Sequence, residues 1–359
     1  MSAIDKQRLE KYRALADRGL WDIDEPAFRD FYARAKREGV DLVSNNFSTL
    51  GMFRAPHRKD LTAVDIALTG IPMDIGVPNP RPGTRLAPRE VRYWSLDRNL
   101  VHYLTKVCPF DLCSIIDWGD VEFEEDAYHL DANLETIYRV YAAYQGAGIS
   151  PLTIGGEHTC TYGILKAMSA HGEQPLALIH LDAHADTSVG FGGTRISDAT
   201  LFQVASVEGF IDPERTVQIG LRGRGLPRAD FSYASGMQVI LADAVHAQGI
   251  APVLERIHEV IGERPCYLSI DTDVLDCAVM PGTTLPEPFG LSGLQVREII
   301  LGVRDMNIVG ADLMELSPPY DAGGMSACLA SGLAFELLCL LAECHSRRNG
   351  RPRQTHWSV

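Results

Sequence analysis

The chain has 359 residues, of which 46% are hydrophobic, so it is long enough to bury one large core. Its formal net charge is −14 and it carries no basic stripe, which argues against nucleic acid as a partner. No apolar run reaches transmembrane length, and the N-terminus is too polar for a signal peptide, so we expect no membrane partner.

The eight cysteines form no CxxC pair, and several of them lie in apolar runs. Cysteines of this kind are typically buried thiols that stay reduced. We therefore expect a cytoplasmic protein.

Residues 1–62 are predicted to form a charged, helical N-terminal extension. Segments 4–19 and 25–39 have apolar residues at helical spacing, and each ends in glycine. Residues 63–359 are predicted to form one large domain.

In that domain short apolar strands alternate with amphipathic helices, for example 132–148 and 251–263. The predicted strands are 65–72, 113–120, 149–156, 177–184, 216–223, 237–243, 266–271 and 307–316. This rhythm predicts an α/β fold with a mostly parallel sheet and helices on both of its faces. In such sheets ligands bind at the carboxyl ends of the strands.

Candidate metal ligands occur in two segments, at or just after predicted strands. They are Asp182, His184 and Asp186 in DAHAD, and Asp271, Asp273 and Asp276 in SIDTDVLD. Alternate residues of a strand point to one side, so the DAHAD ligands should converge, and so should Asp271 and Asp273. Carboxylates gathered in a low-dielectric cleft repel one another unless cations neutralise them. Either segment alone is more typical of a solvated loop, but the two together predict a pair of divalent cations.

A third segment, ISPLTIGGEHT, ends an apolar run in Gly155 and Gly156, followed by His158. A tight turn there presents an imidazole near a strand end. Alone, His158 would more often be a loop histidine with a hydrogen-bond partner. Beside the two acidic segments we expect it to bind metal, because histidine is the commonest nitrogen ligand of catalytic metals.

The motifs GGEHT, DAHAD and SIDTDVLD, in this order, resemble those of the ureohydrolases, the arginase and agmatinase family that hydrolyses guanidinium compounds. Thr69–Arg92 is similar to the N-terminal signature of the family, and Asp312–Asp321 is similar to its closing strand. The resemblance covers about residues 65–345. It implies a three-layer arginase-like fold and a ureohydrolase catalytic domain over residues 63–359.

The resemblance also implies a metal-dependent hydrolase that cleaves a C–N bond of a linear amidine. Its cofactors would be two divalent metal ions, Ni²⁺ or Mn²⁺, which lower the pKa of a shared water. The implied ligands fall into two sets, with some carboxylates bridging them: His158, Asp182, Asp186 and Asp273 on one side of the pair, and His184 and Asp271 on the other. Glu315 would hold the NH groups of the guanidinium through charge-assisted hydrogen bonds.

Several positions depart from the family pattern. Agmatinase-like members carry a segment similar to THGTPF, whose histidine shuttles protons, but this chain has SDATLF, with Asp198 at that position. A carboxylate cannot transfer protons in the same way unless its pKa is raised, although it can attract a second cationic group. Glu157 is one methylene longer than the aspartate of the familiar GGDHS, and Cys277 replaces a proline.

The loop MPGTTLPEPFGL has Thr284, Leu285 and Phe289 where relatives favour small or hydroxyl residues. One interpretation is drift at tolerant positions, and the other is a bulkier, more apolar pocket. On the second interpretation, the predicted substrate-binding residues are Glu315, Asp198, Leu285 and Phe289. The predicted catalytic residues are Glu315, Asp198 and Asp186.

Three functions are compatible with these residues. The favoured one is hydrolysis of a non-standard guanidine, such as metformin (dimethylbiguanide) or guanidine itself. The second is an agmatinase or guanidino-acid hydrolase that releases urea, with Arg195 or Arg224 holding a carboxylate tail. The third is a non-catalytic subunit of a hetero-oligomer, suggested by the missing shuttle histidine but opposed by the retained candidate ligands. The expected partners are a small cationic guanidine-type substrate and further subunits of a trimer or hexamer, possibly with a homologous second subunit.

Overall fold

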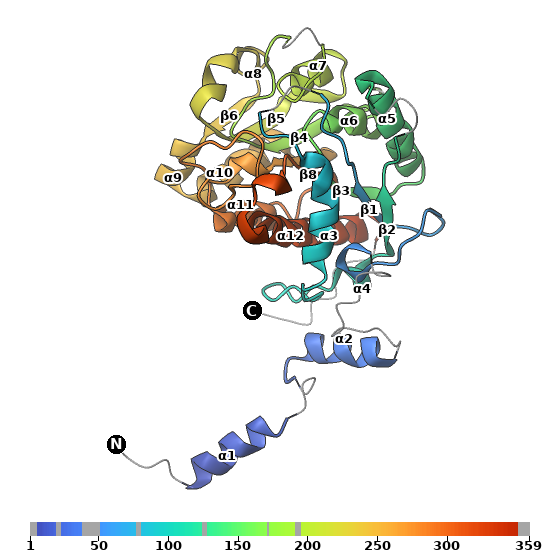
Figure 1. The fold of residues 1–359 in the computed structure, drawn as a ribbon, viewed down its shortest axis with the longest axis vertical. Helices are drawn as coiled ribbons and strands as arrows, with labels where there is room; N and C mark the ends of the chain where they lie inside the picture. The colour runs from blue at the N-terminus through green and yellow to red at the C-terminus, as the bar shows by residue number, and fades with distance from the viewer. Residues whose placement is uncertain are drawn as a thin grey trace.

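The computed structural model describes residues 6–18, 23–37, 51–76, 80–123, 128–170, 172–190 and 195–350. All eight predicted strands are present in one sheet, in the order β2-β1-β3-β8-β7-β4-β5-β6 (Figure 1). The strands are β1 (Ile66–Gly70), β2 (Ile115–Asp120), β3 (Ser150–Ile154), β4 (Leu176–Leu181), β5 (Ile211–Leu221), β6 (Gln238–Leu241), β7 (Cys266–Asp271) and β8 (Ile308–Met314). Neighbouring strands are parallel throughout, so the prediction of a parallel sheet is confirmed.

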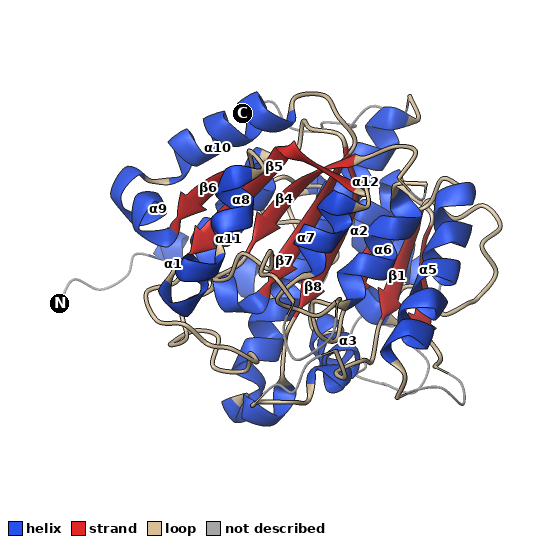
Figure 2. Ribbon diagram, turned by 90° about the horizontal axis from the view of Figure 1, so that it is seen from above, coloured by secondary structure: helices blue, strands red, loops and turns tan. Residues whose placement is uncertain are grey.

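Helices cover both faces of the sheet, as Figure 2 shows, and the predicted three-layer arrangement is confirmed. The helices are α1 (Lys6–Ala16), α2 (Pro26–Arg37), α3 (Ala87–Ser95), α4 (Pro109–Leu112), α5 (Leu130–Gly146), α6 (Cys160–Met168), α7 (Leu201–Val207), α8 (Asp230–Ala234), α9 (Ala242–Gln248), α10 (Ile250–Ile261), α11 (Gly293–Gly302) and α12 (Met325–Arg348). Parallel strands need such crossovers, because a tight turn cannot connect them.

Alternation along the strands divides the apolar core into two layers. Leu68 and Ile179 pack with α10, α11 and α12 on one face. Their neighbours Ala67 and Leu178 pack with α5, α6 and α7 on the other face. Because both faces are buried, the strands are apolar at consecutive positions, as expected for a parallel sheet inside an α/β protein.

Helix α12 is long and apolar enough to span a membrane by length and composition alone. However, 78% of its most apolar window is buried inside the protein, as in the core helix of a globular domain. It packs against α3, α11 and β8.

The described part of the predicted N-terminal extension contains α1 and α2. Phe31 of α2, together with Met52 and Phe53, is buried in the main core, and Arg34 pairs with Asp111 at 2.5 Å. The extension therefore contributes to the core of the large domain. Its residues 1–5, 19–22 and 38–50 lie outside the described residues, as do 351–359 of the predicted domain. The boundary between 62 and 63 stays a prediction.

The sheet order brings the motif segments together. Strands β3, β8, β7 and β4 are consecutive, and they lead into GGEHT, Glu315, the Asp271 segment and DAHAD respectively. All four segments therefore meet at one edge of the sheet, where its strands have their carboxyl ends.

Candidate metal centre

Three carboxylates surround the imidazole of His158. Its Nδ1 lies 3.3 Å from Asp182 Oδ2, 3.2 Å from Asp186 Oδ2 and 3.3 Å from Asp271 Oδ2. All four side chains are buried, with residue exposures of 8% or less. One nitrogen and three oxygens thus converge on a single point.

A second group forms around His184. Its Nδ1 lies 2.9 Å from Asp273 Oδ2 and 3.5 Å from Asp182 Oδ1. Asp182 therefore faces both imidazoles, one with each carboxylate oxygen. Two overlapping sets of side chains can each hold a cation. The candidate ligand atoms of His158, His180, Asp182 and Asp186 lie within 4.8 Å of one another, and so do those of Asp182, His184 and Asp273.

The division of the ligands between the two groups differs from the expected one. Asp271 lies beside His158 and Asp273 beside His184, whereas the resemblance placed them the other way round. The reason is that β7 ends at Asp271, whose Oδ1 accepts a hydrogen bond from the Asp273 amide and starts a 3₁₀ turn. Asp273 then accepts a hydrogen bond from the Ala183 amide, which ties it to the DAHAD loop.

Asp276, the third acid of the same segment, has a different role. Its two carboxylate oxygens accept hydrogen bonds from the amides of Ala278 and Gly290, both at 2.9 Å. It stabilises a loop and does not belong to either group.

Hydrogen bonding fixes which nitrogen of His158 is free. Nε2 lies 2.8 Å from Ser269 Oγ, and this hydroxyl donates its own hydrogen to Asp312 Oδ1. Nε2 is therefore the donor, and Nδ1 presents a lone pair to the three carboxylates. Nδ1 is buried without a hydrogen-bond partner.

This arrangement requires a positive charge. Burial lowers the pKa of His158, but the carboxylates of Asp182, Asp186 and Asp271 outweigh it and raise that pKa well above its usual value. Burial, followed by the charge of Asp182, raises the pKa of Asp186 to about 8. Either protons or cations must neutralise the group, and imidazole with carboxylate oxygens is a donor set that fits a divalent transition metal.

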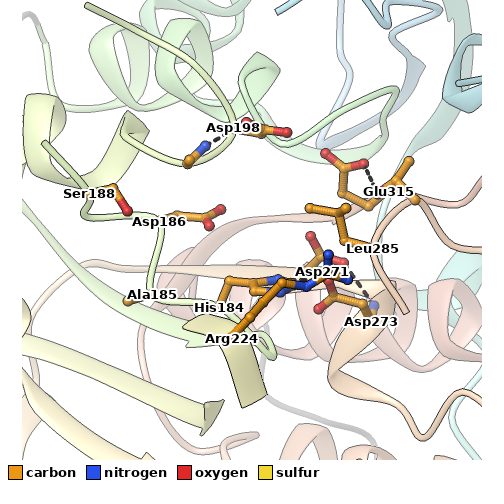
Figure 3. Close-up of a pocket in the computed structure, with 12 residues that line it drawn as sticks. His184, Ala185, Asp186, Ser188, Asp198, Arg224, Asp271, Asp273, Leu285 and Glu315 are labelled. Carbon is orange, nitrogen blue, oxygen red and sulfur yellow. Dashed lines mark hydrogen bonds and ion pairs between the residues drawn. The ribbon is translucent and has the colours of Figure 1, made fainter. Parts of the chain in front are cut away.

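A pocket of about 90 Å³ opens beside the two groups. Figure 3 shows Asp198 and Glu315 on two sides of it, with Leu285 beside Glu315. The lining residues are His184, Ala185, Asp186, Ser188, Asp198, Ala199, Arg224, Asp271, Asp273, Thr284, Leu285 and Glu315. The structure thus brings three of the four predicted substrate-binding residues together with the candidate metal ligands.

Phe289, the fourth, does not line the pocket. It is 79% exposed, and its φ of 62° is unusual for a residue other than glycine. Arg222 binds the carbonyl oxygens of Glu287 and Pro288 and so fixes the preceding backbone. Phe289 therefore stays outside the pocket lining in this structure, and its packing on a substrate stays a prediction.

Of the two arginines proposed to hold a carboxylate tail, only Arg224 lies at the pocket. Its Nε donates to Glu287 Oε1 at 2.6 Å, and its side chain is 59% exposed. Arg195 instead pairs with Glu208 at 2.5 Å, away from the pocket lining.

Buried acids line the pocket, and burial together with their mutual repulsion disfavours their charged forms. Burial, followed by the nearby Asp198, raises the pKa of Glu315 well above its usual value. Two of the acids, Asp186 and Glu315, have left-handed backbones, with φ of 51° and 67°. Such strained conformations concentrate at functional sites, where the surrounding structure maintains them.

Comparisons with known proteins agree with this geometry. Residues 64–339 match the arginase family model. The chain belongs to the arginase family. This confirms the resemblance of its motifs to those of the ureohydrolases.

Curated relatives include the human mitochondrial guanidino acid hydrolase, which is 38% identical over 304 residues that cover 84% of this chain and 85% of that protein. Guanidinopropionase of Pseudomonas aeruginosa is 39% identical over 297 residues, which cover 82% and 92% of the two chains. Among solved structures, proclavaminate amidino hydrolase from Streptomyces clavuligerus has a TM-score of 0.79 and 34% identity, covering 84% of this chain and 99% of that one. This arginase-family chain is accordingly a metal-dependent hydrolase that acts on C–N bonds.

Sequence reasoning missed two residues that support the ligands of this arginase-family site. His180 Nε2 lies 2.8 Å from Asp182 Oδ2, and Gln218 Nε2 lies 3.0 Å from His180 Nδ1. The same Gln218 nitrogen contacts Ala185 O at 2.7 Å, and a carbonyl oxygen only accepts, so this atom is the amide donor. His180 Nδ1 then accepts, and Nε2 donates to Asp182. The signal was available, because His180 is a polar residue inside an apolar strand.

Replacing Gln218 by Met should weaken metal binding about 10- to 100-fold, because His180 would lose the donor that fixes its tautomer and orients Asp182. Competition with a chelator would measure the affinity. Gln238→Met is a matched control, since Gln238 lies on β6 and pairs with Arg256. Unchanged affinity in the Gln218 variant would contradict this supporting role.

Proposed function

We propose that this arginase-family hydrolase cleaves a C–N bond of a compact guanidine-type cation, such as guanidine or dimethylbiguanide (metformin). The observation that carries the proposal is the opposed pair of carboxylates, Asp198 and Glu315, across one small pocket (Figure 3). A single carboxylate can hold one edge of a guanidinium. A second one, buried on the facing wall, favours a cation that offers NH groups on two sides.

The size and the apolar wall of the pocket support the same class of substrate. A volume of about 90 Å³ is about that of three water molecules in the liquid, so the pocket suits a compact cation with few carbon atoms. Leu285 lines the same pocket beside Glu315 and can pack on methyl groups. Dimethylbiguanide combines a delocalised cation with two methyl groups.

The residues of this chain have the following roles in the proposal. Glu315 and Asp198 bind and orient the cation, so that its central carbon faces the two metal-ligand groups. These groups would hold divalent cations, Ni²⁺ or Mn²⁺, which when bound would lower the pKa of water and neutralise the carboxylates. The water oxygen bonds to the carbon and the C–N bond breaks. Asp186 and Asp198 both line the pocket, so either carboxylate can take the proton that water loses and pass it to the leaving nitrogen.

The second candidate is a guanidino-acid hydrolase, and Arg224 favours it. This guanidinium lies in the pocket wall and can receive a carboxylate tail. The names of the relatives, guanidinopropionase among them, point the same way. Glu287 already pairs with Arg224, however, and reduces the positive charge that a tail would meet.

A product screen by mass spectrometry tests the proposal. Protein loaded with Ni²⁺ or Mn²⁺ would be given guanidine, agmatine, arginine, 4-guanidinobutyrate and dimethylbiguanide. Turnover confined to guanidine or the biguanide would support the proposal. Turnover of 4-guanidinobutyrate or agmatine would instead favour a conventional ureohydrolase. If metal-loaded protein turned over none of these compounds, the third function, a subunit that needs a partner, would be favoured.

Replacing Leu285 by Gly should raise the KM for dimethylbiguanide about tenfold and that for guanidine less than about twofold, because only the biguanide carries methyl groups for the leucine to pack on. Steady-state kinetics with both substrates would measure the ratio. Leu104→Gly is a control at an exposed leucine that does not line the pocket. Equal losses on both substrates would point to general damage of the loop.

We also propose a cytoplasmic trimer or hexamer, possibly with a homologous second subunit. The eight cysteines are free, which suits a reducing compartment. Three large apolar side chains within one stretch of sequence, Val279, Phe289 and Leu294, are exposed by 45%, 79% and 59%, and a subunit contact would bury them.

A further inference from the structure

Both oxygens of the Glu315 carboxylate are already held by donors of the chain. Oε1 accepts a hydrogen bond from the His158 amide at 2.6 Å, and Oε2 accepts one from the Thr284 hydroxyl at 2.5 Å. Glu315 and Thr284 are each only 3% exposed. The hydroxyl must be the donor to an ionised carboxylate, because that group only accepts.

The main chain of Glu315 is held as well. Its amide donates to Gly156 O at 2.9 Å, and its carbonyl accepts a hydrogen bond from the Thr283 hydroxyl at 3.2 Å. Consecutive threonines therefore bind the backbone and the carboxylate of one strained residue. These hydrogen bonds offset an unfavourable contribution to the free energy of folding. Glu315 has a φ of 67° and faces the charge of Asp198.

We infer that Thr284 is a positioning residue that sets how Glu315 presents its remaining lone pairs to a guanidinium. The inference rests on the proposed function only in taking Glu315 as the guanidinium-binding group. One chain donor on each oxygen leaves both oxygens free to accept from the pocket side, which suits the two parallel N–H groups of a guanidinium edge. The hydroxyl also restricts rotation of the carboxylate, so less freedom is lost when the cation binds.

The experiment compares Thr284→Val, which keeps the shape but removes the donor, with Thr284→Ser, which keeps the donor. The probe is guanidinium chloride, titrated calorimetrically into metal-loaded full-length protein. The Val variant should bind guanidinium about tenfold more weakly, because a hydrogen bond to a charged group is lost. The Ser variant should stay within about twofold of the original protein. With a substrate that is turned over, KM should rise in the Val variant while kcat changes by less than about threefold.

Thr216→Val serves as the matched control. Thr216 is a fully buried threonine of β5 whose hydroxyl donates to the carbonyl of Asp212, away from the pocket lining. It should bind guanidinium like the original protein, and all the variants should retain the same metal content. A general penalty for losing a buried hydroxyl would affect Thr216→Val and Thr284→Val alike.

The outcomes separate this inference from the proposed function. If the protein turns over agmatine or a guanidino acid, the proposed substrate class is wrong, but the difference between Val and Ser should persist. The inference would be overturned if the Val variant bound guanidinium as tightly as the original protein, or if the Val and Ser variants bound it equally weakly. Failure of the original metal-loaded protein to bind guanidinium would overturn both.

Discussion

Replacing Asp182 by Ala should lower turnover at least about 10³-fold and abolish loading of the metal pair. Asp182 faces both imidazoles, with Oδ2 at 3.3 Å from His158 and Oδ1 at 3.5 Å from His184. It also accepts hydrogen bonds from the His184 amide and from His180. Its removal takes one anion from both groups at once. Elemental analysis of the purified protein, together with a turnover assay, would measure the two effects.

Thermal unfolding distinguishes loss of metal from loss of fold. Asp182 is buried and accepts hydrogen bonds from His180 and from the His184 amide, so Asp182→Ala should lower the melting temperature of the metal-free protein while a cooperative unfolding transition is kept. Added Mn²⁺ or Ni²⁺ should raise the melting temperature of the original protein, because only the folded state binds the cation. It should leave that of Asp182→Ala unchanged.

Asp276→Asn provides the control for this prediction. Asp276 belongs to the same acidic segment, but its oxygens accept hydrogen bonds only from loop amides, as far as the described residues show. Metal content and turnover should therefore be retained in this variant. Full activity and full metal loading in Asp182→Ala would contradict the two-metal assignment.

The strands could be predicted from the sequence, but their order could not. Each strand is an uninterrupted apolar run next to turn residues, which is a local signal. In the sheet, however, β8 lies between β3 and β7. That pairing joins segments more than 100 residues apart, as in Leu152 with Ala311, and periodicity carries no information about it.

The candidate ligands could be predicted because their types and spacing are unusual, whereas their grouping depended on the backbone. Asp271 and Asp273 have strand-like spacing, but the chain turns between them, so they serve different imidazoles. The position of Phe289 outside the pocket has the same kind of cause, a local turn that sequence reasoning treated as a pocket loop.

The layer beneath the ligands follows from the register of the strands. His180 is paired with Ser269, and Ser269 with Asp312, on three adjacent strands. Each is a polar residue in an apolar run, and each contacts a candidate ligand or supports one that does. Polar residues inside apolar strands were a signal in the sequence that these side chains support the metal ligands. The strand register that places them next to one another is set by tertiary structure.

Replacing Asp198 by His should shift the substrate preference of the enzyme from compact cations towards conventional guanidines. Asp198 is 8% exposed and lies opposite Glu315 across the pocket (Figure 3). The substitution removes one of two anions that hold a compact cation. It also installs the residue that shuttles protons in agmatinase-like proteins. We expect kcat/KM for guanidine or dimethylbiguanide to fall about 10- to 100-fold.

Asp198→Asn separates the two consequences of this change, because it removes the charge without adding an imidazole. If Asp198 selects the substrate through its charge, Asn and His should lose activity equally on compact cations. If a histidine at this position supports hydrolysis of conventional guanidines, only the His variant should show a higher kcat/KM for agmatine or 4-guanidinobutyrate. The ratio of kcat/KM values across the substrate panel measures both effects.

An unchanged substrate ranking in Asp198→His would contradict the selecting role and leave the position as tolerant of drift. A reversed ranking in the His variant alone would indicate that one buried position controls both the charge that the substrate meets and the path of the proton. The pocket geometry favours this second result, because Asp198 and Asp186 line the same small pocket beside the candidate metal ligands. A group at position 198 is therefore within the space to which the proposed function assigns both substrate binding and proton transfer.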